Sequence, residues 1–157
     1  MEVQEPEYIQ AKKFVVQRLA MKNYSSFELI KALKERSVSK EVIDKIIGEF
    51  TKQGYINDDD WIKCFIRRQQ QRNLGPQQIA MKLRAKAVPK EQIQKSLEKM
   101  DSSDSQLQRI QELLEGRFRS KDLTDYKEKQ KVFAALARKG FDFEVIQEAI
   151  SLALERD

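Results

Sequence analysis

The chain has 157 residues, a formal net charge of +5 and 35% charged side chains. Its length is enough for an ordinary hydrophobic core without disulfides, and only five glycines and three prolines, the poorest helix formers, interrupt it. Histidine is absent, which removes the commonest general base and metal ligand, and the single cysteine excludes an internal disulfide.

Several classes of protein are disfavoured by what the sequence lacks. No apolar run approaches the roughly 18 residues that a membrane span needs, and the acidic N-terminus has no apolar segment typical of a secretory signal. There is no phosphate-binding loop, CxxC pair or nucleophile elbow. We therefore expect a soluble, cytoplasmic protein that is not an enzyme, with no catalytic residue, no metal site and no cofactor.

Helical spacing of apolar residues begins near the N-terminus. The first predicted helix covers about residues 11–20, where Phe14, Val15 and Leu19 recur at helical intervals. The segment that opens at Leu33 then has the pattern of a helix end, a turn and a helix start. Segments that open at Leu83 and Leu136 align with it without gaps, 50 and 53 residues apart (83 − 33 and 136 − 83). This period indicates a helical repeat.

The aligned segments share their turn chemistry. The turn residues are Ser37–Val38, Ala87–Val88 and Gly140–Phe141. Among them only Gly140 is a residue type that adopts a left-handed helix end without strain. Ser39 and Asp142 suit the N-cap of the following helix, and Pro89 suits a helix start.

The remaining helices complete three similar units. One is predicted to begin near Asp60, and another contains Leu107, Ile110, Leu113 and Leu114 at helical spacing. Residues 116–125 are predicted to hold the longest loop of the third unit. The predicted fold is all-α: three tandem three-helix repeats, similar to helix-turn-helix units, in an elongated arrangement with contacts only between neighbours. The repeats cover about residues 8–57, 58–100 and 105–154, and residues 101–105 (DSSDS) form a polar link.

The central repeat contains a long stretch of one charge sign. Residues 61–90 include eight basic side chains and five glutamines but no acidic residue. Such a field attracts polyanions or acidic protein surfaces, and arginine and lysine suit phosphates and carboxylates alike. A solvated helix face is the alternative. The predicted contact residues are Lys63, Arg67, Arg68, Arg72, Lys82, Arg84 and Lys86, with Lys12, Lys13 and Arg18 as extensions.

The helix that carries the first of these residues is amphipathic. Asp58, Asp59 and Asp60 favour the positive end of its dipole. On the same helix, from Trp61 onward, the apolar arc comprises Trp61, Ile62, Cys64, Phe65 and Ile66. We interpret Cys64 as a small core residue.

Two arginines follow on the same helix, and a glycine and a proline follow at its end. Arg68 and Arg72 are predicted on the same side as Trp61, so their stems either cover apolar surface or project past the core towards a partner. Gly75 is expected to supply the helix terminus, and Pro76 the first position of the next helix.

Five segments of the sequence resemble one protein family. Residues 54–61 (GYINDDDW), 65–68 (FIRR) and 75–83 (GPxxIxxxL) resemble the central signature of the RecX family of bacterial recombination regulators. Residues 24–33 (YSxxELxxxL) resemble its N-terminal unit, and residues 136–141 (LARKGF) resemble its C-terminal element.

The resemblance covers about residues 11–154 and implies tandem three-helix repeats. It also implies a modulator, usually a negative one, that binds the RecA recombinase and its filament on single-stranded DNA. Such proteins lie in the filament groove, suppress ATP hydrolysis and strand exchange, and favour disassembly. Where the family often has a glycine at the repeat turn, this sequence has Ser37 and Ala87, and Trp61-Ile62 replaces its aromatic–alanine pair.

We therefore expect a monomeric regulator whose basic residues contact acidic recombinase surface and DNA backbone, with weak direct binding to DNA. One alternative is a helix-turn-helix-like protein that binds nucleic acid directly, through Gln77, Gln78 and Arg84. That protein would bind naked DNA tightly, with a steep dependence on salt. Another is a helical scaffold that docks an acidic protein unrelated to DNA.

Overall fold

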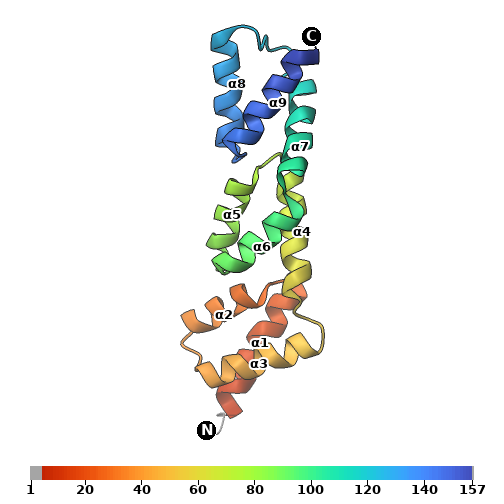
Figure 1. The fold of residues 1–157 in the computed structure, drawn as a ribbon. Coiled ribbons are helices and arrows are strands. Elements are labelled where there is room, and N and C mark those ends of the chain that lie inside the picture. Colours follow the sequence, from red (N-terminus) through yellow and green to blue (C-terminus); the bar gives the residue numbers. More distant parts are fainter. Residues whose placement is uncertain (1–4, 157) are drawn as a thin grey trace. The chain divides into compact units, whose positions relative to one another are not determined.

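The structure, a computed structural model, describes residues 5–156. In that part of the chain nine α-helices and no strand are present, which confirms the all-α prediction (Figure 1). The helices are α1 (Glu5–Met21), α2 (Ser26–Glu35), α3 (Lys40–Lys52), α4 (Asp58–Gln71), α5 (Pro76–Ala85), α6 (Lys90–Met100), α7 (Ser103–Glu115), α8 (Tyr126–Arg138) and α9 (Phe143–Arg156). None of these helices is long and apolar enough to cross a bilayer.

Contacts between residues group the chain into two compact units. Unit 1 contains residues 5–65 and the turn Lys86–Val88, and unit 2 contains residues 66–85 and 89–156. The boundary falls inside α4, whose first eight residues belong to unit 1. The division into three repeats at the predicted boundaries stays a proposal.

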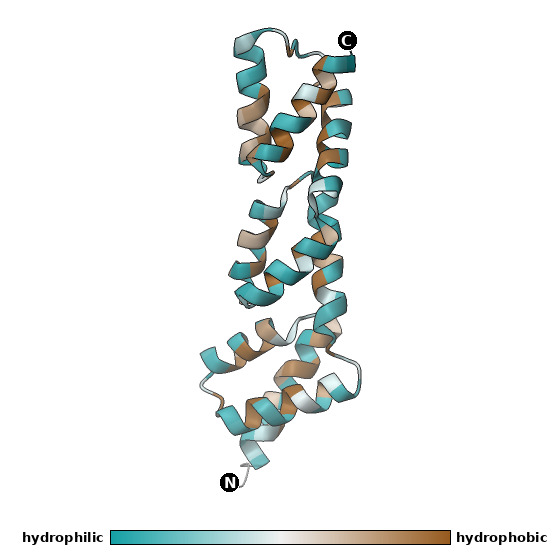
Figure 2. Ribbon diagram, in the orientation of Figure 1, coloured by the Kyte–Doolittle hydropathy of each residue, from teal (hydrophilic) through white to brown (hydrophobic). Residues whose placement is uncertain are grey.

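The core of unit 1 lies between α1, α2 and α3. Brown and teal positions alternate along these helices in Figure 2, as amphipathic helices require. The buried residues are Ala11, Val15, Leu29, Leu33, Val42, Ile43, Ile46, Phe50 and Ile56. Ser25 caps α2 by accepting a hydrogen bond from the Glu28 N–H at 3.1 Å, and Ser39 caps α3 as predicted. Capping and burial together explain why these short helices form.

Unit 2 has a second core between α7, α8 and α9. Its buried residues are Ile110, Leu113, Leu114, Val132, Leu136, Phe141, Val145, Ile146, Ala149 and Ile150. In the same unit α5 packs on α6 and buries Ile79, Leu83, Ile93 and Leu97. The long loop at 116–125 lies where it was predicted, between α7 and α8.

Helices repeatedly end in a left-handed residue. The residues with positive φ are Ser37 (61°), Gly54 (86°), Asn73 (64°), Ala87 (67°) and Gly140 (99°). After Ser37 the Val38 N–H bonds back to the Leu33 carbonyl at 3.1 Å, as in a Schellman motif. The left-handed conformation was expected to be free of strain only at Gly140. It also occurs at Ser37 and Ala87, where the Cβ atom makes this conformation cost about 1–2 kcal/mol.

The role predicted for Gly75 is wrong, because Asn73 is the left-handed residue that ends α4. Gly75 is required for a close backbone approach: a Cβ there would lie 2.4 Å from the carbonyl carbon of Gly140. The Gly75 N–H donates to the Lys139 carbonyl at 2.7 Å, and the Gln77 N–H donates to the Gly140 carbonyl at 3.0 Å. The start of α5 is therefore bonded directly to the turn between α8 and α9.

The run at 101–105 is not a polar link, because α7 begins at Ser103 and Asp101 is only 4% exposed. The Asp101 carboxylate accepts hydrogen bonds from Arg109 at 2.7 Å and Ser105 at 3.2 Å. Burial raises the pKa of the Asp101 carboxyl above its ordinary value of 3.8, an effect that Arg109 opposes without cancelling it. Asp101 is thus part of the interior of unit 2, whereas residues 102–104 are exposed.

Asp142 occupies the predicted N-cap position of α9, but its carboxylate also bonds to other helices. It accepts hydrogen bonds from the buried Gln106 at 3.0 Å and from Gln77 at 3.4 Å. The Asp142 N–H in turn donates to Gln106 at 3.1 Å. These bonds connect α5, α7 and the start of α9 within unit 2.

We expect Gly75→Ala to lower the free energy of unfolding by about 3 kcal/mol or more, because the added Cβ forces two backbone segments apart and breaks their hydrogen bonds. Gly48→Ala is the control, since a Cβ there meets nothing within 4 Å and replaces a helical glycine, which should add about 1 kcal/mol. Urea denaturation followed by circular dichroism measures both. Equal stability of Gly75→Ala and wild type would contradict the contact.

We expect Ala87→Gly to raise the free energy of unfolding by about 0.5–1 kcal/mol, because relief of the left-handed strain exceeds the added entropy of the unfolded chain. Ala85→Gly, in the last helical position of α5, should instead lower it by up to about 1 kcal/mol. Thermal denaturation of the two variants should therefore shift the midpoint in opposite directions. Shifts of the same sign would argue against a strained turn.

A raised folded-state pKa means that folded Asp101 binds its proton more tightly than the unfolded chain does. Its contribution to stability is then fully present below 3.8 and declines as pH rises towards the folded-state pKa. We expect the stability difference between wild type and Asp101→Asn to fall as pH rises from about 3.5 to about 7. Urea titrations at each pH measure it, and a difference that grows with pH would show that the Arg109 pair outweighs burial.

Candidate partner-binding surface

The helix α4 turns a charged face to solvent along its length. Trp61, Ile62, Phe65 and Ile66 are buried, whereas Lys63, Arg67 and Arg68 are exposed. Lys63 and Arg67 are four residues apart and lie one helical turn from each other on the outer face. The periodicity of α4 therefore places Lys63 and Arg67 away from the core, as predicted, whereas Arg68, which was predicted on the side of Trp61, is exposed as well.

The prediction that Cys64 is a core residue is wrong, because its side chain is exposed. At about 100° per residue, Cys64 lies roughly 130° from the centre of the buried arc of α4. The arc is narrower than predicted, since Phe65 and Ile66 fill it together with Trp61, whose ring stacks on Phe65 at 5.3 Å. The fifth buried position is taken by Gln69, four residues after Phe65.

Unit 2 contains five of the seven predicted contact residues. Arg67, Arg68, Arg72, Lys82 and Arg84 are all exposed, and we call these five residues the basic surface. Within residues 5–156, Arg67, Arg72, Lys82 and Arg84 have no carboxylate within 4.0 Å. The helix α5 presents Lys82 and Arg84 because Ile79 and Leu83 take its buried positions.

The two other predicted contact residues belong to unit 1. Lys63 is exposed on α4, one turn before Arg67. Lys86 is half-buried, and its Nζ lies 3.3 Å from the Glu28 carboxylate. Its charge is thus partly neutralised inside unit 1, a pairing that sequence periodicity could not reveal because Glu28 is 58 residues away.

The predicted extensions lie exposed on α1, where aromatic rings engage two of the three cations. The Arg18 guanidinium lies 5.0 Å from the centre of the Phe14 ring, and Arg36 lies 4.4 Å from the same ring. Lys12 lies 5.7 Å from the ring of Tyr8. Lys13 is exposed, with no such contact in the described part of the chain. Cation–π contacts fix these side chains while leaving them charged.

Polar contacts at the start of α2 were not predicted from the sequence. The Asp58 carboxylate accepts hydrogen bonds from the Ser26 N–H at 2.6 Å and from the Ser26 hydroxyl at 2.5 Å. Asp58 therefore joins the starts of α2 and α4 in unit 1, in addition to its favourable interaction with the dipole of α4. No group of three His, Cys, Asp or Glu side chains in residues 5–156 is arranged to hold a metal ion.

Comparisons with known proteins agree on one family. A family model described as "RecX, third three-helix domain" matches residues 104–150. The regulatory protein RecX of Caldanaerobacter subterraneus subsp. tengcongensis is 27% identical over 143 residues, which cover 91% of this chain and 70% of that protein. That of Bacillus subtilis is 26% identical over 133 residues, which cover 84% of this chain and 50% of that protein. The chain thus spans half of the Bacillus relative.

A solved structure supports the same fold. The crystal structure of RecX from Lactobacillus salivarius superimposes with a TM-score of 0.78 over 94% of this chain and 97% of that chain, at 18% sequence identity. The match of the third three-helix domain and the sequence similarity along most of the chain show that this chain is similar to regulatory proteins named RecX, and the solved structure shows that it shares their all-helical fold.

Proposed function

We propose that this chain is a regulatory protein that binds the RecA recombinase and its filament on single-stranded DNA, and inhibits ATP hydrolysis and strand exchange. Relatives that match most of the chain are named regulatory protein RecX, which supports a regulatory role. The proposal of RecA as partner follows from the resemblance of the sequence to the RecX family.

One observation carries the proposed binding mode. Arg67, Arg68, Arg72, Lys82 and Arg84 are exposed in unit 2, and no acidic residue occurs anywhere between residues 61 and 90. An excess of positive charge of this kind attracts a polyanion or an acidic protein surface, and increases the rate of encounter with it. A nucleoprotein filament presents both kinds of surface.

The mechanism is occupancy. Arginine forks bind phosphate or carboxylate groups in a bidentate manner, and Lys82 adds a mobile point charge. A regulator held in this way along a filament blocks the rearrangement of recombinase subunits and the access of DNA to them. The chain itself performs no chemistry in this proposal. It acts as a monomer in the cytoplasm, and its direct affinity for DNA is weak.

We expect the triple variant Arg67→Glu, Arg72→Glu, Lys82→Glu to need at least about tenfold more protein for half-maximal inhibition of RecA ATP hydrolysis on single-stranded DNA. Three exposed cations become anions, so attraction to phosphate and carboxylate groups turns into repulsion. The assay titrates each protein at ratios well below one molecule per recombinase subunit.

The control is Lys127→Glu, Lys129→Glu, Lys131→Glu, which reverses three exposed charges of α8 and changes the net charge equally. It should inhibit like wild type. An equal loss in both variants would show that net charge, and not the basic surface, decides binding. Wild-type protein that leaves the ATPase rate unchanged would contradict RecA as the partner.

A second measurement distinguishes direct binding to nucleic acid from binding to the recombinase filament. If inhibition appears only at protein concentrations that coat the DNA, and naked-DNA affinity falls by about one log unit per log unit of salt for each neutralised phosphate, the helix-turn-helix-like alternative is favoured. Tight binding to the filament with weak binding to naked DNA supports the proposed function.

A further inference from the structure

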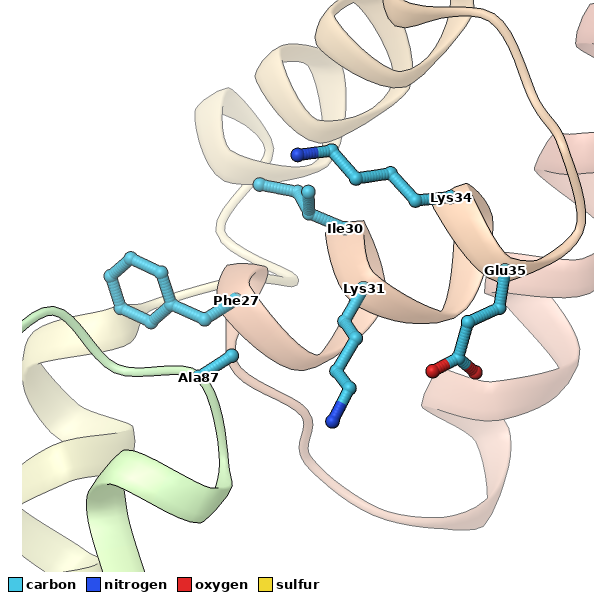
Figure 3. Close-up of a pocket in the computed structure, with 6 residues that line it drawn as sticks. All are labelled: Phe27, Ile30, Lys31, Lys34, Glu35 and Ala87. Atoms are coloured by element: carbon cyan, nitrogen blue, oxygen red, sulfur yellow. The ribbon is translucent and has the colours of Figure 1, made fainter.

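Unit 1 has a surface hollow on α2 that the basic surface does not include. Its volume is about 460 Å³, and α2 supplies all but one of its lining residues (Figure 3). The lining consists of Phe27, Ile30, Lys31, Lys34, Glu35 and Ala87. We call this feature the α2 hollow. Its size lies within the range of ligand-binding clefts in proteins.

The floor of the α2 hollow is apolar. Ile30 is half-buried against the core of unit 1, whereas Phe27 is half-buried but is not among the side chains packed on that core in the described residues. Figure 3 shows the Phe27 ring beside Ala87. An aromatic ring that is only partly covered by its own protein can still bury area against a partner.

The rim of the α2 hollow is positively charged. Lys31 and Lys34 are exposed and extend from opposite sides of α2 in Figure 3. Neither lysine has a carboxylate within 4.0 Å in residues 5–156. Glu35 is the one acidic lining residue, so the lining has a net charge of +1. The hollow thus combines an apolar floor with a cation on each side.

Polar contacts hold both walls of the α2 hollow in place. Ser25 and Asp58 bond to the first turn of α2, and Glu28 pairs with Lys86, the residue next to Ala87. Val88, on the other side of Ala87, is buried. A binding site that is already formed loses little conformational entropy when a ligand enters.

We propose that the α2 hollow binds an acidic protein segment, which inserts an apolar side chain between carboxylates that meet Lys31 and Lys34. The apolar floor requires an apolar anchor, and the two lysines require negative charge on both sides of it. A nucleic-acid backbone supplies the charge but no side chain for the floor. The proposal rests on the proposed function only for the identity of the protein that carries the segment, the recombinase.

The experiment is a titration of the ¹⁵N-labelled chain with three blocked peptides, followed by NMR. The first is Glu-Glu-Leu-Phe-Glu-Glu, the second replaces Leu-Phe by Gly-Gly, and the third replaces every Glu by Lys. The first peptide should shift the amide signals of Phe27, Lys31, Lys34 and Ala87. The other two peptides should bind there at least about fivefold more weakly, a loss of about 1 kcal/mol.

Variants of the chain test the same two requirements. Lys31→Glu with Lys34→Glu, and separately Phe27→Ala, should each weaken the acidic apolar peptide at least about fivefold. Lys40→Glu with Lys52→Glu reverses two exposed charges of α3 and should change the affinity less than about twofold. An unchanged spectrum outside the substituted region shows that each variant is folded.

Three results would overturn the proposal: shifts confined to α4 and α5, equal binding of the Gly-Gly peptide, or stronger shifts of the same amides with single-stranded DNA. The recombinase is absent from these titrations, so their outcome is independent of the ATPase assay. If the peptide binds the hollow but the recombinase is not inhibited, the hollow still binds acidic segments, and only the recombinase as the source of the segment is contradicted. If inhibition occurs and the peptide does not bind, the proposed function stands without the hollow.

Discussion

The close approach of Gly75 and Gly140 is the constraint on which the packing of unit 2 depends. Two backbone hydrogen bonds, from Gly75 to Lys139 and from Gln77 to Gly140, connect the start of α5 to the turn between α8 and α9. Such bonds form only where no side chain separates the two backbones. A Cβ on Gly140 would meet the Gln78 nitrogen at 2.5 Å, so neither glycine tolerates a larger residue.

Unit 2 also contains a network of buried and half-buried polar side chains. Gln106 bonds to Asp142, and Arg109 bonds to Asp101 and also lies 4.9 Å from the Phe141 ring. Buried polar groups are costly unless they are paired, so such a network favours one arrangement of α5, α7 and α9 over its alternatives. This polar network explains why residues predicted to lie in two separate repeats belong to one compact unit.

The same helix-ending turn recurs along the chain with different residues. Gly140 adopts it without strain, but Ser37 and Ala87 adopt it with a Cβ. Val88, which follows Ala87, is buried, and Val38, which follows Ser37, is half-buried, while Phe141 after Gly140 is also buried. Burial of an apolar side chain stabilises by about 1.5–3 kcal/mol, which offsets the strain. The repeat therefore maintains the turn geometry through packing, and glycine is not required at every copy.

The charge of the chain is divided by its tertiary contacts. The thirty-residue basic run contributes exposed cations on α4 and α5, but Lys86 turns back to pair with Glu28. That pair positions the turn at Ala87 next to α2, where Lys31 and Lys34 border the α2 hollow. Charge that looks continuous in the sequence is thus not all available to a partner, because Lys86 is paired within unit 1, and the cations of the α2 hollow come from a different part of the sequence.

Sequence alone determined the all-α fold, the helix order and the outward position of Lys63 and Arg67 on α4 and of Arg84 on α5, because local periodicity and capping depend on neighbouring residues. It also located the long loop and the turn positions. Only the tertiary structure decided the exposure of Cys64, the packing role of Gly75, the burial of Asp101 and the pairing of Lys86. Each of these depends on a residue distant in sequence or on the width of a buried arc, and no local pattern encodes such contacts. Gly140 is 65 residues from Gly75, and Glu28 is 58 residues from Lys86.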